Sequence, residues 1–357
     1  MKLEYLIPII FWFLSLIYPS GLAISLELPD KINLLLSLIT FYIFTKHNVG
    51  EVFKLSSGYY ILLFLIFIII PIITVGRFEG LSYLIAFFVT YTVSFIDVTD
   101  EFLKKTSYVI AFMGLILLYI YIYGQVLSGW NDNAISMMGL FSFLYYSCYL
   151  FTKEELVFTH KIIVALFLFF LFQNDCRSAM LSILLTVILF QKRSLSNSII
   201  QNRNFPFLLI CFPLFISFFV IYVSSLDVFQ VLNEWSIENF NKTIFNGRDE
   251  LWSESLLSLN SIWGKGYFYL NFHNSAVACI AAFGILGFIL WYYLLKSYLV
   301  VLISFFEDKI VLGCLISFSI IYLQQSVDLG FICPYPNFIP YLILGIGIGR
   351  VRILLNH

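Results

Sequence analysis

Residues 60–70 read YILLFLIFIII, and residues 162–172 read IIVALFLFFLF. Neither stretch holds a charged residue or alternates apolar with polar positions, as a strand of a membrane β-barrel would. Backbone groups in lipid must be hydrogen-bonded within their own segment, so uncharged runs of this kind predict membrane-spanning α-helices. Similar runs recur along the whole chain, which indicates an all-α, polytopic membrane protein.

Composition excludes several other classes. The chain has 357 residues, of which 61% are hydrophobic and 11% charged, against about 25% charged in ordinary soluble proteins. These charges are too few to cover a soluble globule, and the apolar content excludes disorder. The formal net charge is −1, and no basic tail or patch indicates a nucleic-acid partner.

Breaks marked by charge, Pro, Gly and Asn divide the chain into about twelve predicted transmembrane helices in a single integral membrane domain, residues 1–357. Most predicted loops are short, but residues 227–274 form a long one with Trp, Asn, Ser and both charge signs. We expect short helices within this loop. The predicted spans are 3–18, 31–45, 58–75, 81–97, 107–127, 136–151, 157–174, 178–191, 206–225, 276–298, 309–326 and 338–352.

The basic residues predict an orientation. With the N-terminus in the cytoplasm, 14 of the 20 Lys and Arg residues fall on the inner side and six on the outer side, as the positive-inside rule requires. Both termini are then cytoplasmic, and the loop 227–274 lies on the outer face of a bacterial inner membrane. No A-x-A site follows the first run, so we interpret it as a retained span and not as a signal peptide.

His273 is the one histidine of four that is predicted to face outward, in the sequence NFHNS (271–275). Histidine is the usual proton-transfer group near neutral pH. The alternative is an interfacial histidine at a helix start, where Asn274 is suited to cap the next helix.

Three arginines are also predicted to face outward. Arg177 lies in NDCRSA (174–179), Arg248 in FNGRDELW (245–252) and Arg77 in GRFEG (76–80). Arginine at bilayer depth costs a few kcal/mol, so it is usually paired or functional. Each of the three has an acidic neighbour, and a local ion pair is therefore the alternative to anion binding.

The loop combines features that favour an anion. Asn246 or Gly247 is suited to cap a helix that begins at Arg248, which would place a guanidinium at the positive helix end. In WGKGY (263–267), Lys265 adds a cation between two glycines. We predict no metal and no cofactor, because solvated helix acids are commoner than a metal site for the nearby carboxylates of Asp249, Glu250 and Glu254.

Two further patterns have structural interpretations. The six cysteines form no C-x-x-C pair, and a bond between Cys176 and Cys333 is the alternative to simple packing. The sequence GIGIGR (345–350) is typical of close helix packing and not of nucleotide binding.

The order of these motifs resembles the O-antigen polymerase and O-antigen ligase superfamily of bacterial envelope biogenesis. The similar features are an arginine in a membrane break, N-G-R-x-E-x-W, G-x-G, H-N, and an apolar helix with AFGILG (282–287). The resemblance implies a glycosyltransferase that uses a polyprenyl diphosphate donor. It implies that Arg177 and Arg248 hold the diphosphate and that His273 lies beside the reacting centre. Arg77, Gly247, Lys265 and Asn274 are expected to bind substrate; Arg77 matches no family motif and is included for its side and charge.

The expected activity is polymerisation of O-antigen or capsular repeat units. A glycan would pass from undecaprenyl diphosphate to a lipid-linked repeat unit, with inversion and without metal, and a chain-length regulator is an expected membrane partner. The nearest alternative is an O-antigen ligase. An alternative of another class is a flippase for the lipid-linked oligosaccharide, although transporters usually show two similar halves and polar residues near mid-membrane.

Overall fold

The structure is a computed structural model, and the residues it describes form helices, turns and short connecting segments, with no strand among them. It describes residues 3–17, 63, 66, 69, 89–124, 132–240, 243–245, 247–257, 262, 264, 273–328 and 337–356. The predicted spans 31–45 and 58–75 lie almost wholly outside these residues.

The described helices follow the apolar runs of the sequence. Every other predicted span coincides with helical residues; of 81–97 the structure describes 89–97, and residues 89–94 of these are helical. The first and last spans are α1 (Leu6–Ile17) and α17 (Ile339–Leu355). The helices between them are α7 (Asp100–Tyr123), α8 (Asp132–Leu150), α9 (Phe158–Gln173), α10 (Arg177–Gln191), α12 (Phe205–Ser224), α15 (Ser275–Ile303) and α16 (Lys309–Gln324).

Among the described residues, α7, α12 and α15 are long and apolar enough to cross a membrane. A fourth crossing results if α10 and α11 (Arg193–Gln201), which meet at a bend of 97°, count as one broken span. The predicted number of twelve therefore remains a prediction. Large apolar side chains on the outside of the bundle, such as Phe112, Phe172 and Phe219, fit a lipid-facing surface.

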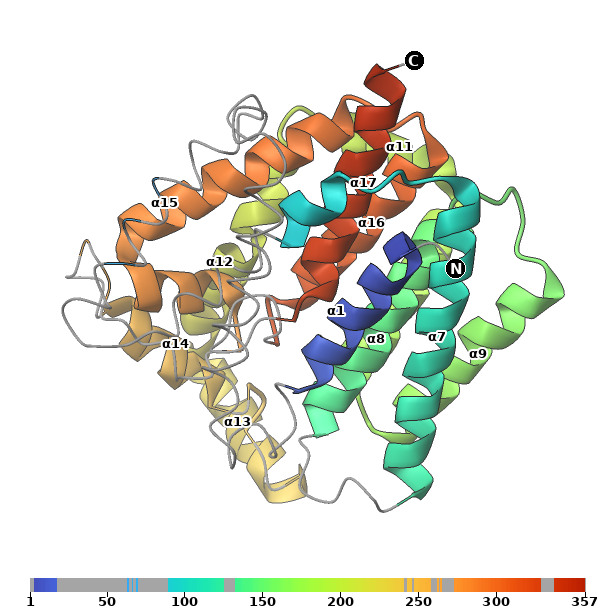
Figure 1. Cartoon of the computed structure of the whole chain (residues 1–357). Coiled ribbons are helices and arrows are strands. Elements are labelled where there is room, and N and C mark those ends of the chain that lie inside the picture. Colours follow the sequence, from blue (N-terminus) through green and yellow to red (C-terminus); the bar gives the residue numbers. More distant parts are fainter. Residues whose placement is uncertain are drawn as a thin grey trace.

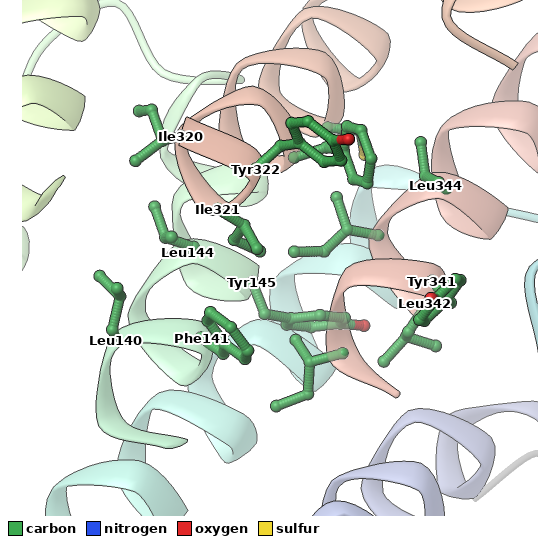
Figure 2. Close-up of a cluster of buried hydrophobic side chains, with 14 of the residues drawn as sticks. Leu140, Phe141, Leu144, Tyr145, Ile320, Ile321, Tyr322, Tyr341, Leu342 and Leu344 are labelled. Carbon is green, nitrogen blue, oxygen red and sulfur yellow. The ribbon is translucent and has the colours of Figure 1, made fainter. Parts of the chain in front are cut away.

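Helices α16 and α17 lie in the middle of the bundle (Figure 1). On one side are α1, α7, α8 and α9, and on the other are α12 and the loop helices α13 (Asp227–Phe240) and α14 (Arg248–Leu257). Figure 2 shows the buried side chains where α8, α16 and α17 meet, among them Tyr145, Tyr322 and Tyr341.

Small residues bring these helices close together, as is usual in membrane bundles. A Cβ atom on Gly114 of α7 would overlap with Ser142 of α8, and one on Gly313 of α16 would crowd the Cys148 carbonyl. The hydroxyl oxygens of Ser147 and Ser317 are 2.6 Å apart across α8 and α16. In GIGIGR (345–350), Cβ atoms on the glycines would meet residues 90–98, Leu302 and Cys314, so the predicted packing role is confirmed.

Charged residues gather at one end of the bundle. Asp308 accepts hydrogen bonds from the first turn of α16 and from Arg350 of α17. Beside it, Lys309 pairs with Glu154, which Arg193 also approaches. At the same end Arg352 pairs with Asp97. The opposite end of α16 reaches residues 324–328, where the predicted site residues lie.

Candidate active site

Asp328 joins two of the predicted site residues. Its carboxylate Oδ1 lies 3.7 Å from Nδ1 of His273, and its negative charge acts on the guanidinium of Arg248. The side chains of Asp328 and His273 are 10% and 27% exposed, so the pair is largely shielded from the surroundings. His273 therefore lies beside a carboxylate whose charge also acts on Arg248, 25 positions earlier in the chain.

Arg248 is held in place by the helix that it starts. Gly247 precedes α14 with a φ of 75°, a left-handed conformation that favours glycine. Its carbonyl accepts the first helical hydrogen bond from Leu251, so the predicted helix start is confirmed. Trp252 is 1% exposed and fixes α14, which packs against α12 and α15.

The Arg248 guanidinium is partly buried. Burial lowers its pKa below the ordinary value, and the charge of Asp328 opposes that shift. Its Nε atom is buried and makes no hydrogen bond to the residues that the structure describes. The structure records no ion pair between Arg248 and Asp249 or Glu250, its acidic neighbours within this part of the chain. A donor of this kind is suited to a phosphate oxygen.

His273 stands at the junction of the loop and α15 with a φ of 48°, a conformation that is uncommon for residues with a side chain. The next residue, Asn274, fixes this junction. Its Oδ1 accepts from the backbone amides of Ala276 and Val277, and its Nδ2 donates to the carbonyls of Pro213 and Ser326.

Asn274 is therefore the helix cap that the sequence predicts. It is fully buried, and its amide is engaged within the protein. A direct contact with substrate stays a prediction, and the geometry gives Asn274 a positioning function for His273.

Arg177 lies at the edge of this cluster. It begins α10, and its Nε lies 3.5 Å from Oδ1 of Asp175, with 84% of its side chain exposed. The local ion pair that the sequence allowed is therefore present. The next residue, Ser178, is connected to Asp328 through Gln324. The Nε2 atom of Gln324 lies 3.4 Å from Oγ of Ser178 and 3.4 Å from Oδ2 of Asp328.

Three helix N-termini converge on residues 324–328. Ser178 in the first turn of α10 contacts Gln324, the amide of Ser275 in α15 donates to the carbonyl of Gln325, and α14 presents Arg248 to Asp328. The positive ends of the three helix dipoles add to the charge of the arginines. Together they offset the negative charge of Asp328 and the negative C-terminal end of α16, which leaves Arg248 as the group suited to an anion.

The structure does not describe some of the predicted site residues. Arg77 and Lys265 lie outside the described residues, as does Cys333, while Cys176 is buried with a free thiol. No group of three potential metal ligands occurs among the described residues.

The sequence prediction missed Asp328. The usable signal was the polar run QQSVD (324–328) at the end of the predicted span 309–326, because a carboxylate in or next to an apolar span is costly, as an arginine is.

Comparisons with known proteins returned no match: no protein-family model, curated protein or solved structure matches the chain.

Proposed function

We propose that the protein is a glycosyltransferase that polymerises lipid-linked repeat units at the outer face of a bacterial inner membrane. The observation that carries the proposal is the meeting of His273, Asp328 and Arg248 where three helix N-termini converge. A base with an orienting carboxylate suits removal of a hydroxyl proton. A guanidinium at converging helix N-termini suits a diphosphate.

In the proposed reaction the acceptor hydroxyl attacks C1 of the donor sugar while the C1–O bond to undecaprenyl diphosphate breaks. His273 takes the hydroxyl proton, and Asp328 stabilises the imidazolium that forms. Negative charge grows on the leaving diphosphate, which Arg248 binds, and Arg177 joins it if its exposed side chain leaves Asp175. One such preorganised donor contributes about 2–4 kcal/mol to transition-state stabilisation.

Direct displacement by the hydroxyl inverts the configuration at C1. Asp328 also provides the carboxylate that a double displacement with retention would require. We assign it to orientation, because Oδ1 faces the His273 imidazole and Oδ2 faces Gln324. Comparing the anomeric configuration of donor and product by NMR tests this assignment; retention would make Asp328 the nucleophile instead.

The decisive experiment uses the purified protein in lipid nanodiscs with a defined undecaprenyl-diphosphate-linked repeat unit. We expect a ladder of longer glycans without nucleotide and in the presence of EDTA. Arg248→Ala and His273→Ala should abolish the ladder while leaving the protein folded, and Arg248→Lys should keep part of it because charge remains but the bidentate fork is lost. A full ladder from either alanine variant would refute the site.

The same preparation separates the alternatives. Glycan transfer to added lipid A-core with no ladder would identify a ligase. Movement of the labelled repeat unit across proteoliposomes, without any new glycosidic bond, would identify a flippase. The described helices themselves show an apolar bundle with its candidate groups at one end, which favours an enzyme whose chemistry occurs at one membrane face.

A further inference from the structure

An apolar groove opens on the side of the bundle below the candidate site. Side chains of α10, α11, α12 and α16 line it and enclose about 320 Å³. The lining has no charged residue, and its exposed surface is almost wholly apolar. Sugars and phosphates would leave their polar groups unpaired there, so the groove suits a hydrocarbon chain.

The upper end of the groove adjoins the site. Leu323 lines it and directly precedes Gln324, the residue that contacts Asp328. Phe212 also lines it and directly precedes Pro213, whose carbonyl accepts the 2.7 Å hydrogen bond from Asn274. The groove and the polar cluster are therefore neighbours along two helices.

The groove extends down the bundle from this point. On α10 it is lined by Leu185 and Leu189, which follow Ser178 by seven and eleven residues, or about 10 and 16 Å at the helical rise. There α11 turns away from α10 by 97° and closes the lower end with Ile199 and Ile200.

The lining stays open to the outside of the bundle. Leu185 and Phe212 are each 37% exposed, and Leu208 is 48% exposed. A hydrocarbon chain bound in the groove would cover these exposed side chains and would contact α16.

We propose that this groove holds part of the isoprenoid chain of the polyprenyl diphosphate donor, with the diphosphate at Arg248. This inference rests on the proposed function for the identity of the head group. It commits the groove to an isoprenoid chain attached to a ligand of the site, and not to the acyl chains of the surrounding phospholipid.

The test is photolabelling of the intact protein in nanodiscs with an undecaprenyl diphosphate that carries a diazirine midway along its chain. We expect mass spectrometry to place the label on α10, α12 and α16 within the groove, and unlabelled undecaprenyl diphosphate to compete. Label on other surfaces, or equal labelling of the groove by a photoreactive phosphatidylethanolamine without such competition, would overturn the inference.

Matched variants add a second readout. Leu185→Trp and Phe212→Trp fill the groove, whereas Leu181→Trp and Phe219→Trp place the same bulk on exposed positions of the same two helices outside it. We expect the groove variants to lower competed labelling roughly tenfold, because the burial of a few methylene groups is lost. The controls should label like the unsubstituted protein; equal loss in both pairs would contradict the inference.

The groove and the proposed function can fail separately. If the probe labels the groove with competition but the protein makes no ladder, the isoprenoid site is supported and the proposed polymerase activity is refuted. A ladder from a protein whose groove stays unlabelled would do the reverse.

Discussion

The Asp328 carboxylate acts on two neighbours at once. Through Oδ1 it faces the His273 imidazole, and through its charge it supports the cationic form of the partly buried Arg248. An asparagine has nearly the same shape and can still meet Gln324, but it cannot stabilise an imidazolium. The charge of this residue, and not its volume, is therefore the property to test.

We expect Asp328→Asn to lower glycan transfer roughly 10²-fold or more, the usual range for losing an effective acid–base group, while the unfolding midpoint changes little. The initial rate of ladder formation measures this. Asp97→Asn is the matched control, because Asp97 is an exposed carboxylate at the other end of the bundle. Similar rates for Asp328→Asn and the control would exclude Asp328 from the reaction.

At this scale the sequence predicted the cations better than their partners. His273 and Arg248 could be singled out because unusual residues in predicted outward loops can be recognised one at a time. Asp328 comes to lie beside His273 only when the end of α16 meets the start of α15, where the amide of Ser275 donates to the carbonyl of Gln325. That contact joins positions 50 residues apart, and no local pattern encodes it.

At the scale of elements, a glycine contact fixes the loop to α15. Gly284 interrupts that helix with a φ of 75°, and a Cβ atom there would overlap with the backbone of Ile262 and Gly264. Gly264 has the same φ, and its Cβ atom would overlap with Gly284 in return. Both glycines belong to motifs singled out in the sequence, Gly264 to WGKGY (263–267) and Gly284 to AFGILG (282–287). Only the folded chain shows that the two glycines are in contact.

We expect Gly284→Ala to destabilise the protein by about 1–3 kcal/mol more than Gly247→Ala does. Both glycines have a φ of 75°, so both substitutions strain the backbone, but a Cβ atom on Gly247 meets nothing within 4 Å. Denaturant unfolding in mixed micelles measures the difference. Equal losses would show that the overlap is relieved without cost.

Two arginines of α17 allow a comparison of ion pairs by burial. Arg350 bonds to Asp308 with side chains 22% and 14% exposed, whereas Arg352 bonds to Asp97 with side chains 36% and 76% exposed. Asp308 also caps α16, so removal of Arg350 leaves a poorly hydrated carboxylate at a helix start.

Arg350→Ala should therefore cost about 2–3 kcal/mol of unfolding free energy, and Arg352→Ala less than about 1 kcal/mol. The same mixed-micelle titration compares the two variants, and added salt should weaken the Arg352 pair more. A larger loss for Arg352→Ala would contradict this ranking.

The apolar runs predicted the described spans well, because length and hydrophobicity are local properties. They did not predict α11, whose Leu195 and Ile199 recur at helical spacing within a short polar segment that we interpreted as a loop. Its place as the floor of the groove depends on the bend after α10. Such a bend is set by packing and not by the composition of either helix.

At the scale of the whole molecule, charge separates the two ends of the bundle. Arg193, Lys309, Arg350 and Arg352 gather at one end, and the His273–Asp328–Arg248 cluster lies at the other. The positive-inside rule predicts that the first end faces the cytoplasm. With this orientation, the proposed site would open on the outer face, where a lipid-linked donor would be used without nucleotide.

Cysteine labelling tests this orientation in intact cells. Glu250→Cys on α14 and Glu155→Cys between α8 and α9 place a thiol at exposed positions of the two ends. Five of the six native cysteines, at 148, 176, 211, 279 and 314, are buried, and Cys333, which lies outside the described residues, is replaced by serine in both variants. A membrane-impermeant maleimide should label Glu250→Cys in intact cells, and Glu155→Cys only after the inner membrane is opened. The opposite pattern would turn the site toward the cytosol, where nucleotide-activated donors are found, and would remove the physical basis for a polyprenyl diphosphate enzyme.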